Sequence, residues 1–590
     1  MRVFTNHPFG FQRIVIAISV FALATLVPAP HVSAQEQVRA EFGVMSPMRD
    51  GIELSSDIWF PQEQGAHPAI LVRTPYLKTM SFGDFNIPGL ASYFARNGYV
   101  VVVQDTRGRG DSDGSFGFFF EDEKDGYDSI EWIAEQPWSN GRVCMMGVSY
   151  LGTVQWLAAK ARPPHLVCIV PTAPAGRYID ELPYQGGAFM MQWALGWING
   201  TSGRISQDNA AQVDWDKVFA HRPLLTMDEV MGRRMPLYRD FLQNHTMNDY
   251  WKRIQFTADD FRAIDLPALT VTGWFDGDQP GALLYWEGAR EYSPARDEQY
   301  LIIGPWNHGQ TFVGGALSVG EMKFSPNSIV DLEELHLSFF DYCLKQTTST
   351  VDFPRARIYV TGSNTWLEEP EYPPAAVEYE RLYFHSGGRA NTLAGDGRLS
   401  WNVPAQEPPD RYTYNPEHPA PMSVDGGSLA KDYRAIERRD DVLVYSTEEL
   451  RETVTVVGRV EVHLYASSSA RDTDFTARVL DVYPDGRAVN LGPSIGVIRA
   501  RYRNGYEATE LLTPNEVAEF NINLHDIGHA FLPGHRIRVE ISSSAYPAVH
   551  PNPNTGNPIA TDTEWNAADQ TVYHDAERAS YVLVPVLPNR

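Results

Sequence analysis

The stretch CMMGVSYLGT (Cys144–Thr153) decides the fold expected of this 590-residue chain. It places Ser149 directly after an apolar run that predicts a buried strand and directly before a predicted helix over residues 150–160. A serine on such a turn presents its hydroxyl at the carboxyl edge of a parallel sheet, above a helix N-terminus. Glycines are expected two residues on either side of the serine, but Leu151 holds the second position and the glycine comes one place late, at Gly152. Alone, the stretch fits either a nucleophile or a serine that ends a strand.

The residues on both sides of this stretch alternate short apolar runs with helical stretches. After a hairpin over 39–61, strands are predicted at 69–76, 99–108, 141–149, 165–174, 267–276 and 298–306, with helices at 89–98, 121–136, 150–160, 280–292 and 328–345. Continuous apolar strands that are joined by helices are typical of a parallel, doubly wound sheet. The sequence therefore predicts an α/β fold made of residues 35–176 and 262–352.

Two other regions depart from this alternation. Residues 177–261 mix Trp, Met and Tyr with charges and contain no β run longer than a few residues, which predicts a helical insertion that caps the carboxyl edge of the sheet. Residues 353–590 contain short alternating strands between Gly, Pro and Asn turns, beginning with RARIYVTG (355–362), and predict a jelly-roll β-sandwich. We expect cap residues to affect substrate choice more than residues of this β domain.

The N-terminus has the order of a secretory signal. Arg2 and Arg13 precede the apolar run IVIAISVFALATLV, and small residues follow up to an expected cleavage after Ala34. This run is shorter than the roughly 20 residues of a membrane-spanning helix, and no later segment is longer. Residues 1–34 are therefore interpreted as a signal peptide. The mature protein is expected to be secreted or periplasmic and to have no membrane span.

The net charge and the number of cysteines further narrow the class of protein. The net charge of −25 makes a nucleic-acid partner unexpected, and it is explained most simply by solubility. Three cysteines are too few for a disulfide scaffold. Cys144 and Cys168 fall in predicted core strands, where we expect buried apolar side chains rather than a bridge. The aspartate-rich loop over 105–117 is interpreted as a plain loop rather than a calcium site.

Two later residues supply the partners that a serine nucleophile needs. In an α/β fold of this kind the acid and then the histidine follow later strands, in the chain order serine, acid, histidine. Asp276 follows LTVTGWF and His308 follows YLIIGPWN, each just past the end of an apolar run. Asp276 could instead cap the next helix and His308 could be a loop residue, but all three positions agree with one arrangement. We therefore predict that Ser149, His308 and Asp276 form a triad for acyl transfer.

Four motifs together resemble one family. GVSYLG (147–152), GWFDG (273–277), GPWNH (304–308) and RTPY (73–76) are similar to the family that includes cocaine esterase, α-amino-acid ester hydrolases, glutaryl acylases and X-Pro dipeptidyl-peptidases. In that family the elbow reads G-x-S-Y-x-G, so the late glycine is the family's own version. The similarity covers essentially the whole mature chain. It implies an α/β-hydrolase fold with an inserted helical cap, followed by a jelly roll.

The resemblance also implies a role for each site residue. Ser149 would be the nucleophile, His308 the base and Asp276 the acid, while the Tyr150 backbone N–H and the Tyr76 hydroxyl would donate to the oxyanion. Tyr76 also suits this role because it ends a predicted buried strand. The implied reaction is cleavage of a small-molecule ester or activated amide through an acyl-enzyme, with no metal or organic cofactor. A homo-oligomer is compatible with the sequence.

Three carboxylates bear on the substrate. Asp278 lies two places after the predicted acid, and RYIDELPYQGGAF (177–189) carries Asp180 and Glu181 before a G-A-F that resembles the amino-acid ester hydrolases. Carboxylates aimed at one point would bind an α-ammonium group. However, Gln279 stands where another acid is expected, so these residues could equally be a helix cap and solvated side chains. Both interpretations stay open at this point.

Alternative functions follow from the same sequence. An X-Pro dipeptidyl-peptidase or acylase activity is one alternative, although the acidity of the chain disfavours a glutaryl group. A catalytically inactive binding protein is an alternative of another class. The intact set of Ser149, Asp276, His308 and Tyr76 argues against it.

Overall fold

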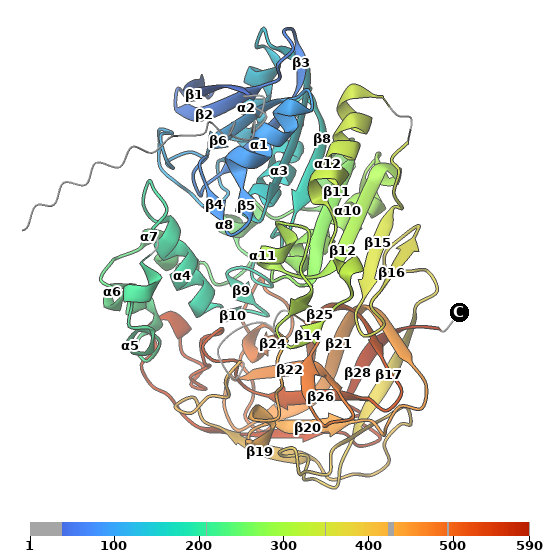
Figure 1. Ribbon diagram of the computed structural model, residues 1–590. Coiled ribbons are helices and arrows are strands. Elements are labelled where there is room, and N and C mark those ends of the chain that lie inside the picture. Colours follow the sequence, from blue (N-terminus) through green and yellow to red (C-terminus); the bar gives the residue numbers. More distant parts are fainter. Residues whose placement is uncertain (1–37, 208, 348–349, 423–429, 493–494, 589–590) are drawn as a thin grey trace, which may run out of the picture. The chain divides into compact units, whose positions relative to one another are not determined.

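The computed structural model describes residues 38–207, 209–347, 350–422, 430–492 and 495–588 (Figure 1). The expected signal peptide lies outside these residues. Within them, no helix combines the length and the apolar character needed to cross a membrane.

A ten-stranded mixed sheet forms the first half of the fold. Its strands, in spatial order, are β1 (Arg39–Pro47), β2 (Glu53–Phe60), β6 (Val100–Asp105), β3 (His67–Thr74), β7 (Ser139–Val148), β8 (Leu166–Thr172), β11 (Ala268–Phe275), β12 (Gln299–Asn307), β15 (Ala356–Val360) and β16 (Thr365–Glu369). The seven strands from β6 to β15 run parallel. The expectation of a parallel sheet therefore holds for the centre, whereas hairpins add antiparallel strands at both edges.

Buried strands and amphipathic helices account for this part of the chain. Every residue of β6 and β11 is buried, as expected for strands covered on both faces. The helices that follow the strands are α1 (Ile87–Arg96), α2 (Asp122–Ala134), α3 (Tyr150–Ala161), α10 (Gln279–Tyr292) and α12 (Leu332–Phe340). These elements agree with the predicted strand and helix alternation and form an α/β-hydrolase domain (Figure 1).

The last two strands of this sheet come from the region that the sequence assigns to the β domain. The sequence pattern predicts that residues 355–362 belong to the β domain, which is expected to begin at residue 353. In the structure β15 pairs in parallel with β12, and β16 pairs with β15. The alternation of a short edge strand does not reveal which sheet it will join, because that choice depends on pairing with a distant strand.

The helical insertion lies between β8 and β11, as expected. It begins with a two-stranded hairpin and continues through short helices, drawn in green in Figure 1. These elements are β9 (Tyr184–Gln185), β10 (Ala188–Phe189), α4 (Met191–Thr201), α5 (Trp215–Phe219), α6 (Met227–Val230), α7 (Pro236–Gln243), α8 (Asp249–Lys252) and α9 (Ala258–Ala263).

The C-terminal part is an all-β domain built on a twelve-stranded sheet. Its pairs are antiparallel, apart from the single parallel bridge between β18 and β20. The strands are β17 (Glu378–His385), β18 (Arg398–Ser400), β19 (Asp410–Tyr414), β20 (Leu443–Ser446), β21 (Val454–Ser468), β22 (Asp474–Val482), β23 (Ala488–Asn490), β24 (Gly496–Arg499), β25 (Ala518–Phe531), β26 (Arg536–Ser542), β27 (Ala568–Tyr573) and β28 (Tyr581–Leu587).

The two strand cysteines contradict the prediction made for them. Cys144 on β7 and Cys168 on β8 are direct neighbours in the parallel register, with their Cα atoms 4.8 Å apart, and they form a disulfide. Both are buried, as expected, but they are not separate apolar side chains. The prediction was wrong because the apolar pattern gives the burial of a strand residue but not its partner on the next strand.

Candidate active site

Ser149 occupies a strained turn between β7 and α3. Its backbone has φ 60° and ψ −124°, a combination that non-glycine residues rarely adopt. Its N–H donates to the Thr172 carbonyl of β8 at 2.9 Å, which fixes the turn against the neighbouring strand. The side chain is thereby held at the carboxyl edge of the sheet.

Close packing explains both glycines of the elbow. A Cβ on Gly147, where φ is +147°, would lie 2.5 Å from the Cβ of Leu151. A Cβ on Gly152 would lie 2.7 Å from the Thr172 carbonyl oxygen. The late glycine is therefore the position at which α3 touches β8.

His308 links the serine to a buried carboxylate. Its Nδ1 lies 2.7 Å from Asp276 Oδ1, and its Nε2 lies 2.9 Å from Ser149 Oγ. Asp276 is fully buried and also accepts hydrogen bonds from the Thr272 hydroxyl and the Asp278 backbone N–H, each at 3.0 Å. With Nδ1–H donated to Asp276, Nε2 is free to accept the serine proton. The structure thus brings together the three residues predicted from three separate strand ends.

The charge environment favours the protonated form of His308. Burial lowers the pKa of the imidazole, but Asp276 and then Asp278 oppose this effect and raise the pKa to about 9. The Oδ2 atom of Asp278 lies 3.9 Å from Nε2. Proton transfer from serine to His308 would therefore be supported by two nearby negative charges.

Two hydrogen-bond donors flank the serine. The half-buried Tyr76 hydroxyl lines the same cavity as Ser149 and accepts from Trp197 Nε1–H at 3.0 Å. Burial raises the pKa of Tyr76, so this phenol keeps its proton at neutral pH. The Tyr150 backbone N–H is the first of α3, where an amide has no partner within the helix. Their role as oxyanion donors, which the family resemblance implies, stays a prediction.

A cavity of about 780 Å³ opens over Ser149 and His308. Its wall is mainly apolar and includes Phe118 and Phe119 of the hydrolase domain and Trp193 and Trp197 of the cap helix α4. These two tryptophans are not among the predicted site residues, although their spacing of four residues places them on one face of a helix. An aromatic wall of this kind suits an apolar acyl or alcohol group.

The β domain also contributes to the cavity wall. Met422, His525 and Ala548 line it beside residues of the cap. No motif in the sequence marks these three residues, because they reach the site only through the packing of the β domain on the hydrolase domain. The expectation that the cap matters more than the β domain for substrate choice remains a prediction.

Two of the three predicted carboxylates lie in the cavity wall. Asp278 is at the N-terminus of α10, yet its side chain makes no capping hydrogen bond there. Glu181 is 3% exposed, and its carboxylate accepts from the N–H groups of Gly176, Arg177 and Gly281. The alternatives of a helix-capping Asp278 and a solvated Glu181 are therefore wrong.

Asp180 and Gln279 point elsewhere. Asp180 is absent from the cavity wall and accepts a hydrogen bond from the Tyr506 hydroxyl of the β domain at 2.8 Å. Gln279 is fully buried and exchanges hydrogen bonds with the backbone of Asp526 at 2.9 and 3.1 Å. Asp180 thus contacts the β domain and does not face the cavity. Its predicted place in a three-carboxylate site is therefore wrong. Among the described residues, no group of three or more His, Cys, Asp or Glu side chains is arranged to hold a metal ion.

Comparisons with known proteins agree with this architecture. Residues 50–310 match the model of the X-Pro dipeptidyl-peptidase (S15 family), and residues 350–583 match the X-Pro dipeptidyl-peptidase C-terminal non-catalytic domain. The chain is 35% identical over 572 residues to the cocaine esterase of Rhodococcus sp. (strain MB1 Bresler), covering 92% of this chain and 98% of that protein.

Two solved structures are similar over almost the whole chain. One is an α-amino acid ester hydrolase, with a TM-score of 0.82, 26% identity and coverage of 96% of this chain and 100% of the other. The second is an aminopeptidase from a marine sediment archaeon (Thaumarchaeota archaeon), also with a TM-score of 0.82 and 26% identity, covering 94% and 96% of the two chains. The chain therefore belongs to the S15 family that includes cocaine esterase, and it is a serine hydrolase that acts on esters.

Proposed function

We propose that this serine hydrolase cleaves carboxylic esters with Ser149, His308 and Asp276 as its catalytic triad. The observation that carries the proposal is the continuous contact from Asp276 Oδ1 through His308 to Ser149 Oγ, at 2.7 and 2.9 Å. This contact lies on the floor of an apolar cavity large enough for an aromatic ester.

The reaction would proceed through an acyl-enzyme. His308 Nε2 takes the serine proton while Oγ attacks the ester carbonyl, and Asp276 stabilises the imidazolium that forms. The Tyr76 hydroxyl and the Tyr150 N–H donate to the oxyanion of the tetrahedral intermediate. His308 then gives its proton to the departing alkoxide, and a water molecule activated by the same histidine hydrolyses the acyl-enzyme.

Two variants test these assignments. Ser149→Ala should abolish turnover and labelling by a fluorophosphonate, since the Ser149 hydroxyl is the nucleophile in contact with His308 Nε2. Tyr76→Phe should lower kcat by about 100- to 1,000-fold, as for other lost oxyanion donors. Tyr379→Phe, on the exposed surface of β17, is the matched control. Labelling that survives Ser149→Ala would remove this nucleophile, and normal turnover in Tyr76→Phe would remove the phenol from the oxyanion hole.

A second proposal concerns the substrate: we infer an ester with a free α-amino group. Asp278 and Glu181 share the cavity wall, and burial raises the pKa of both carboxyl groups because a charge is costly there. The Asp278 charge raises the pKa of Glu181 further. An ammonium group of the substrate would relieve that cost. The solved α-amino acid ester hydrolase, similar over nearly the whole chain, supports this choice.

Asp278 is the carboxylate that is free to bind such a group. Glu181 already accepts three backbone hydrogen bonds, whereas within the described part of the chain no group donates a hydrogen bond to the Asp278 side chain. Its Oδ2 lies 3.9 Å from His308 Nε2, so an ammonium bound there would hold the ester carbonyl near Ser149.

The test compares phenylglycine methyl ester with phenylacetic acid methyl ester, which lacks the amino group. We expect a preference for the amine that Asp278→Asn reduces by about 10-fold or more, as for a lost charge-assisted contact. Asp180→Asn is the control, because Asp180 bonds to Tyr506 and not to the cavity. Equal turnover of both esters in the unmodified enzyme would identify a general carboxylesterase.

We also propose that the protein is exported, with cleavage after Ala34. The charged, apolar and small-residue order of residues 1–34 supports this proposal. N-terminal sequencing of the protein recovered from the periplasm or medium should begin at Gln35, and a full-length chain retained in the cytoplasm would contradict it.

A further inference from the structure

The side chain of Tyr150 is held by a buried polar network that the proposed mechanism does not use. Tyr150 is 3% exposed, and its hydroxyl donates to Asp122 Oδ2 at 2.6 Å while accepting from the Phe119 N–H at 3.1 Å. Its ring stacks on Phe119, with the ring centres 4.1 Å apart. The first residue of α3 is therefore fixed through its side chain as well as its backbone.

Asp122 connects this phenol to a fully buried arginine. It is the first residue of α2 and is 4% exposed. Its Oδ1 lies 2.9 Å from a guanidinium nitrogen of Arg73, whose side chain has no exposed area. Burial raises the pKa of Asp122, and Arg73 opposes that shift. Separating the two side chains would leave each buried charge without a partner. This cost keeps Arg73 and Asp122 in contact.

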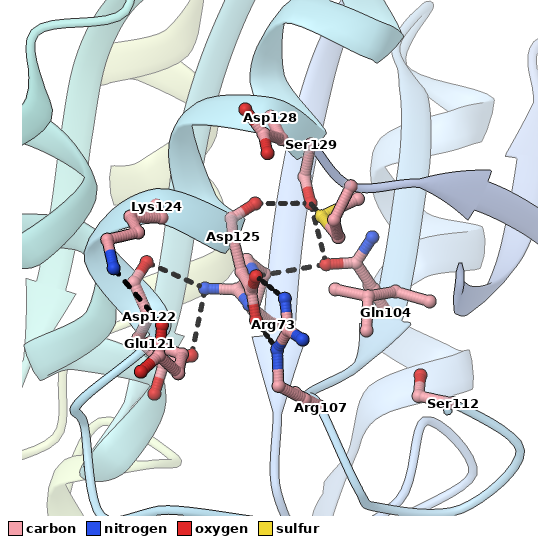
Figure 2. Close-up of polar contacts among 12 residues, drawn as sticks. Arg73, Gln104, Arg107, Ser112, Glu121, Asp122, Lys124, Asp125, Asp128 and Ser129 are labelled. Carbon is pink, nitrogen blue, oxygen red and sulfur yellow. Dashed lines mark hydrogen bonds and ion pairs between the residues drawn. The ribbon is translucent and has the colours of Figure 1, made fainter. Parts of the chain in front are cut away.

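The surroundings of Arg73 explain how the pair is oriented. Figure 2 shows its guanidinium between Asp122 on one side and Gln104 on the other. Gln104 Oε1 accepts from Arg73 Nε and from the Ser129 hydroxyl, each at 2.9 Å. Asp125 lies farther from Arg73, at 3.8 Å, and pairs with Arg107 at 2.6 Å. Gln104 of β6 thus holds the Arg73 guanidinium beside Asp122 of α2.

The network joins the two chain segments that carry the proposed oxyanion donors, the end of β3 and the start of α3. Arg73 is on β3, and Tyr76 follows two residues after the end of that strand. Tyr150 begins α3 and carries the second donor on its backbone, and the rings of Tyr76 and Tyr150 are in edge contact at 6.5 Å. The buried pair of Arg73 and Asp122 therefore ties β3, the strand that leads to Tyr76, to the first residue of α3.

We propose that Asp122, held by Arg73, is a positioning residue of the oxyanion hole: it fixes the Tyr150 side chain and thereby directs the Tyr150 backbone N–H at the oxyanion. This inference rests on the proposed roles of Ser149 and Tyr150. An amide whose direction is fixed before the reaction stabilises developing charge better than one that must reorganise. Loosening the side chain should therefore weaken transition-state binding more than substrate binding.

The experiment uses Tyr150→Phe and Asp122→Asn in the full-length enzyme, with p-nitrophenyl acetate as substrate. In both variants we expect kcat to fall by about 10- to 100-fold, less than for a deleted donor. KM should change by no more than about twofold, because the ground state does not depend on the oxyanion hole. The inhibition constant of phenylboronic acid, which forms a tetrahedral adduct on the serine oxygen, should rise by the same factor as kcat falls.

Asp125→Asn is the matched control. It removes a carboxylate from the same helix and the same cluster, but Asp125 does not contact Tyr150. Its thermal unfolding midpoint should fall while kcat and the boronate inhibition constant stay near those of the unmodified enzyme. If Asp122→Asn does not fold, Tyr150→Phe alone tests the positioning role, because it removes only the hydroxyl that contacts Asp122.

Each outcome separates this inference from the proposed function. Normal kcat and normal boronate inhibition in Tyr150→Phe, with only a lower unfolding midpoint, would show a purely structural network and overturn the inference. Turnover that survives Ser149→Ala would instead overturn the proposed nucleophile. An inactive Ser149→Ala together with a normal Tyr150→Phe would leave the triad standing and reject only the positioning role.

Discussion

At the scale of single residues, Asp276 and Asp278 act on the charge of His308 in the same direction. Asp276 Oδ1 lies 2.7 Å from one ring nitrogen and Asp278 Oδ2 lies 3.9 Å from the other. Burial lowers the pKa of His308, but the two carboxylates outweigh it and raise the pKa to about 9. Burial raises the pKa of Asp278 itself to about 7. A histidine that must be neutral to act as a base is then most available at alkaline pH.

Asp278→Asn should move the pH dependence of catalysis. Removing this negative charge lowers the pKa of His308, so the neutral base persists to lower pH. The acidic limb of kcat/KM should shift down by about 1 to 3 pH units, the range expected for a charge at this distance. The measurement uses phenylacetic acid methyl ester, so that binding of an ammonium group does not contribute. An acidic limb that stays in place, or that moves equally in Asp180→Asn, would contradict this account.

At the scale of elements, the turn from β7 to α3 depends on two glycines that meet different neighbours. Gly147 faces Leu151 of the same turn, whereas Gly152 faces the Thr172 carbonyl of the adjacent strand. The first contact is local, and the second fixes the distance between the helix and the sheet. The position of the elbow glycine is therefore set by where α3 touches β8.

Gly152→Ala should destabilise the protein. The added methyl group would lie 2.7 Å from the Thr172 oxygen and 3.3 Å from Pro174 Cβ. We expect the free energy of unfolding to fall by about 1–3 kcal/mol, as for other overpacked cores. Gly196→Ala is the control, because a methyl group at this position of α4 would meet no neighbouring atom of the described chain within 4 Å, and it should gain roughly 0.5–1 kcal/mol from helix propensity. Equal effects of the two substitutions would exclude the contact with β8 as the cause.

The neighbouring strands β7 and β8 give a second prediction at this scale. Because Cys144 and Cys168 are bonded, the chain keeps one free thiol, on the buried Cys343. Protein denatured without reductant should therefore react with one equivalent of a thiol reagent, and protein denatured after reduction with three. Three equivalents in both samples, from protein that has passed through an oxidising compartment, would show that the bridge does not form.

At the scale of the whole molecule, the cavity over Ser149 is shared between distant parts of the chain. The β domain supplies Met422, His525 and Ala548 to its wall. Backbone and side-chain hydrogen bonds fix this arrangement, including Arg499 N–H to the Gly186 carbonyl at 2.9 Å and the Tyr506 hydroxyl to Asp180 at 2.8 Å. The β domain therefore both completes the cavity and holds the cap hairpin in place.

Ala548→Leu should change substrate size selection. Its longer side chain would extend into a cavity of about 780 Å³ and displace the bulkier esters first. We expect kcat/KM for a phenylacetyl ester to fall by about 10-fold, with little change for an acetyl ester, as for other changes of one or two methylene groups in a pocket. Ala376→Leu, on the exposed surface of the β domain, is the control. A parallel loss for both esters would indicate general damage rather than altered selection.

The sequence alone determined the local features of this protein. Apolar runs with two-sided burial predicted the central parallel strands, and the ends of three such runs predicted Ser149, Asp276 and His308. The strand prediction succeeds because burial and strand ends are properties of consecutive residues, and the structure brings the three residues into contact. The family resemblance added Tyr76 and explained the late glycine at position 152.

The tertiary structure decided what depends on contacts between distant residues. It paired Cys144 with Cys168, joined residues 356–360 to the hydrolase sheet, and turned Asp180 toward Tyr506 rather than into the cavity. It also brought residues of the β domain to the cavity wall. None of these follows from local pattern, because strand register and domain packing depend on which surfaces meet after the chain has folded.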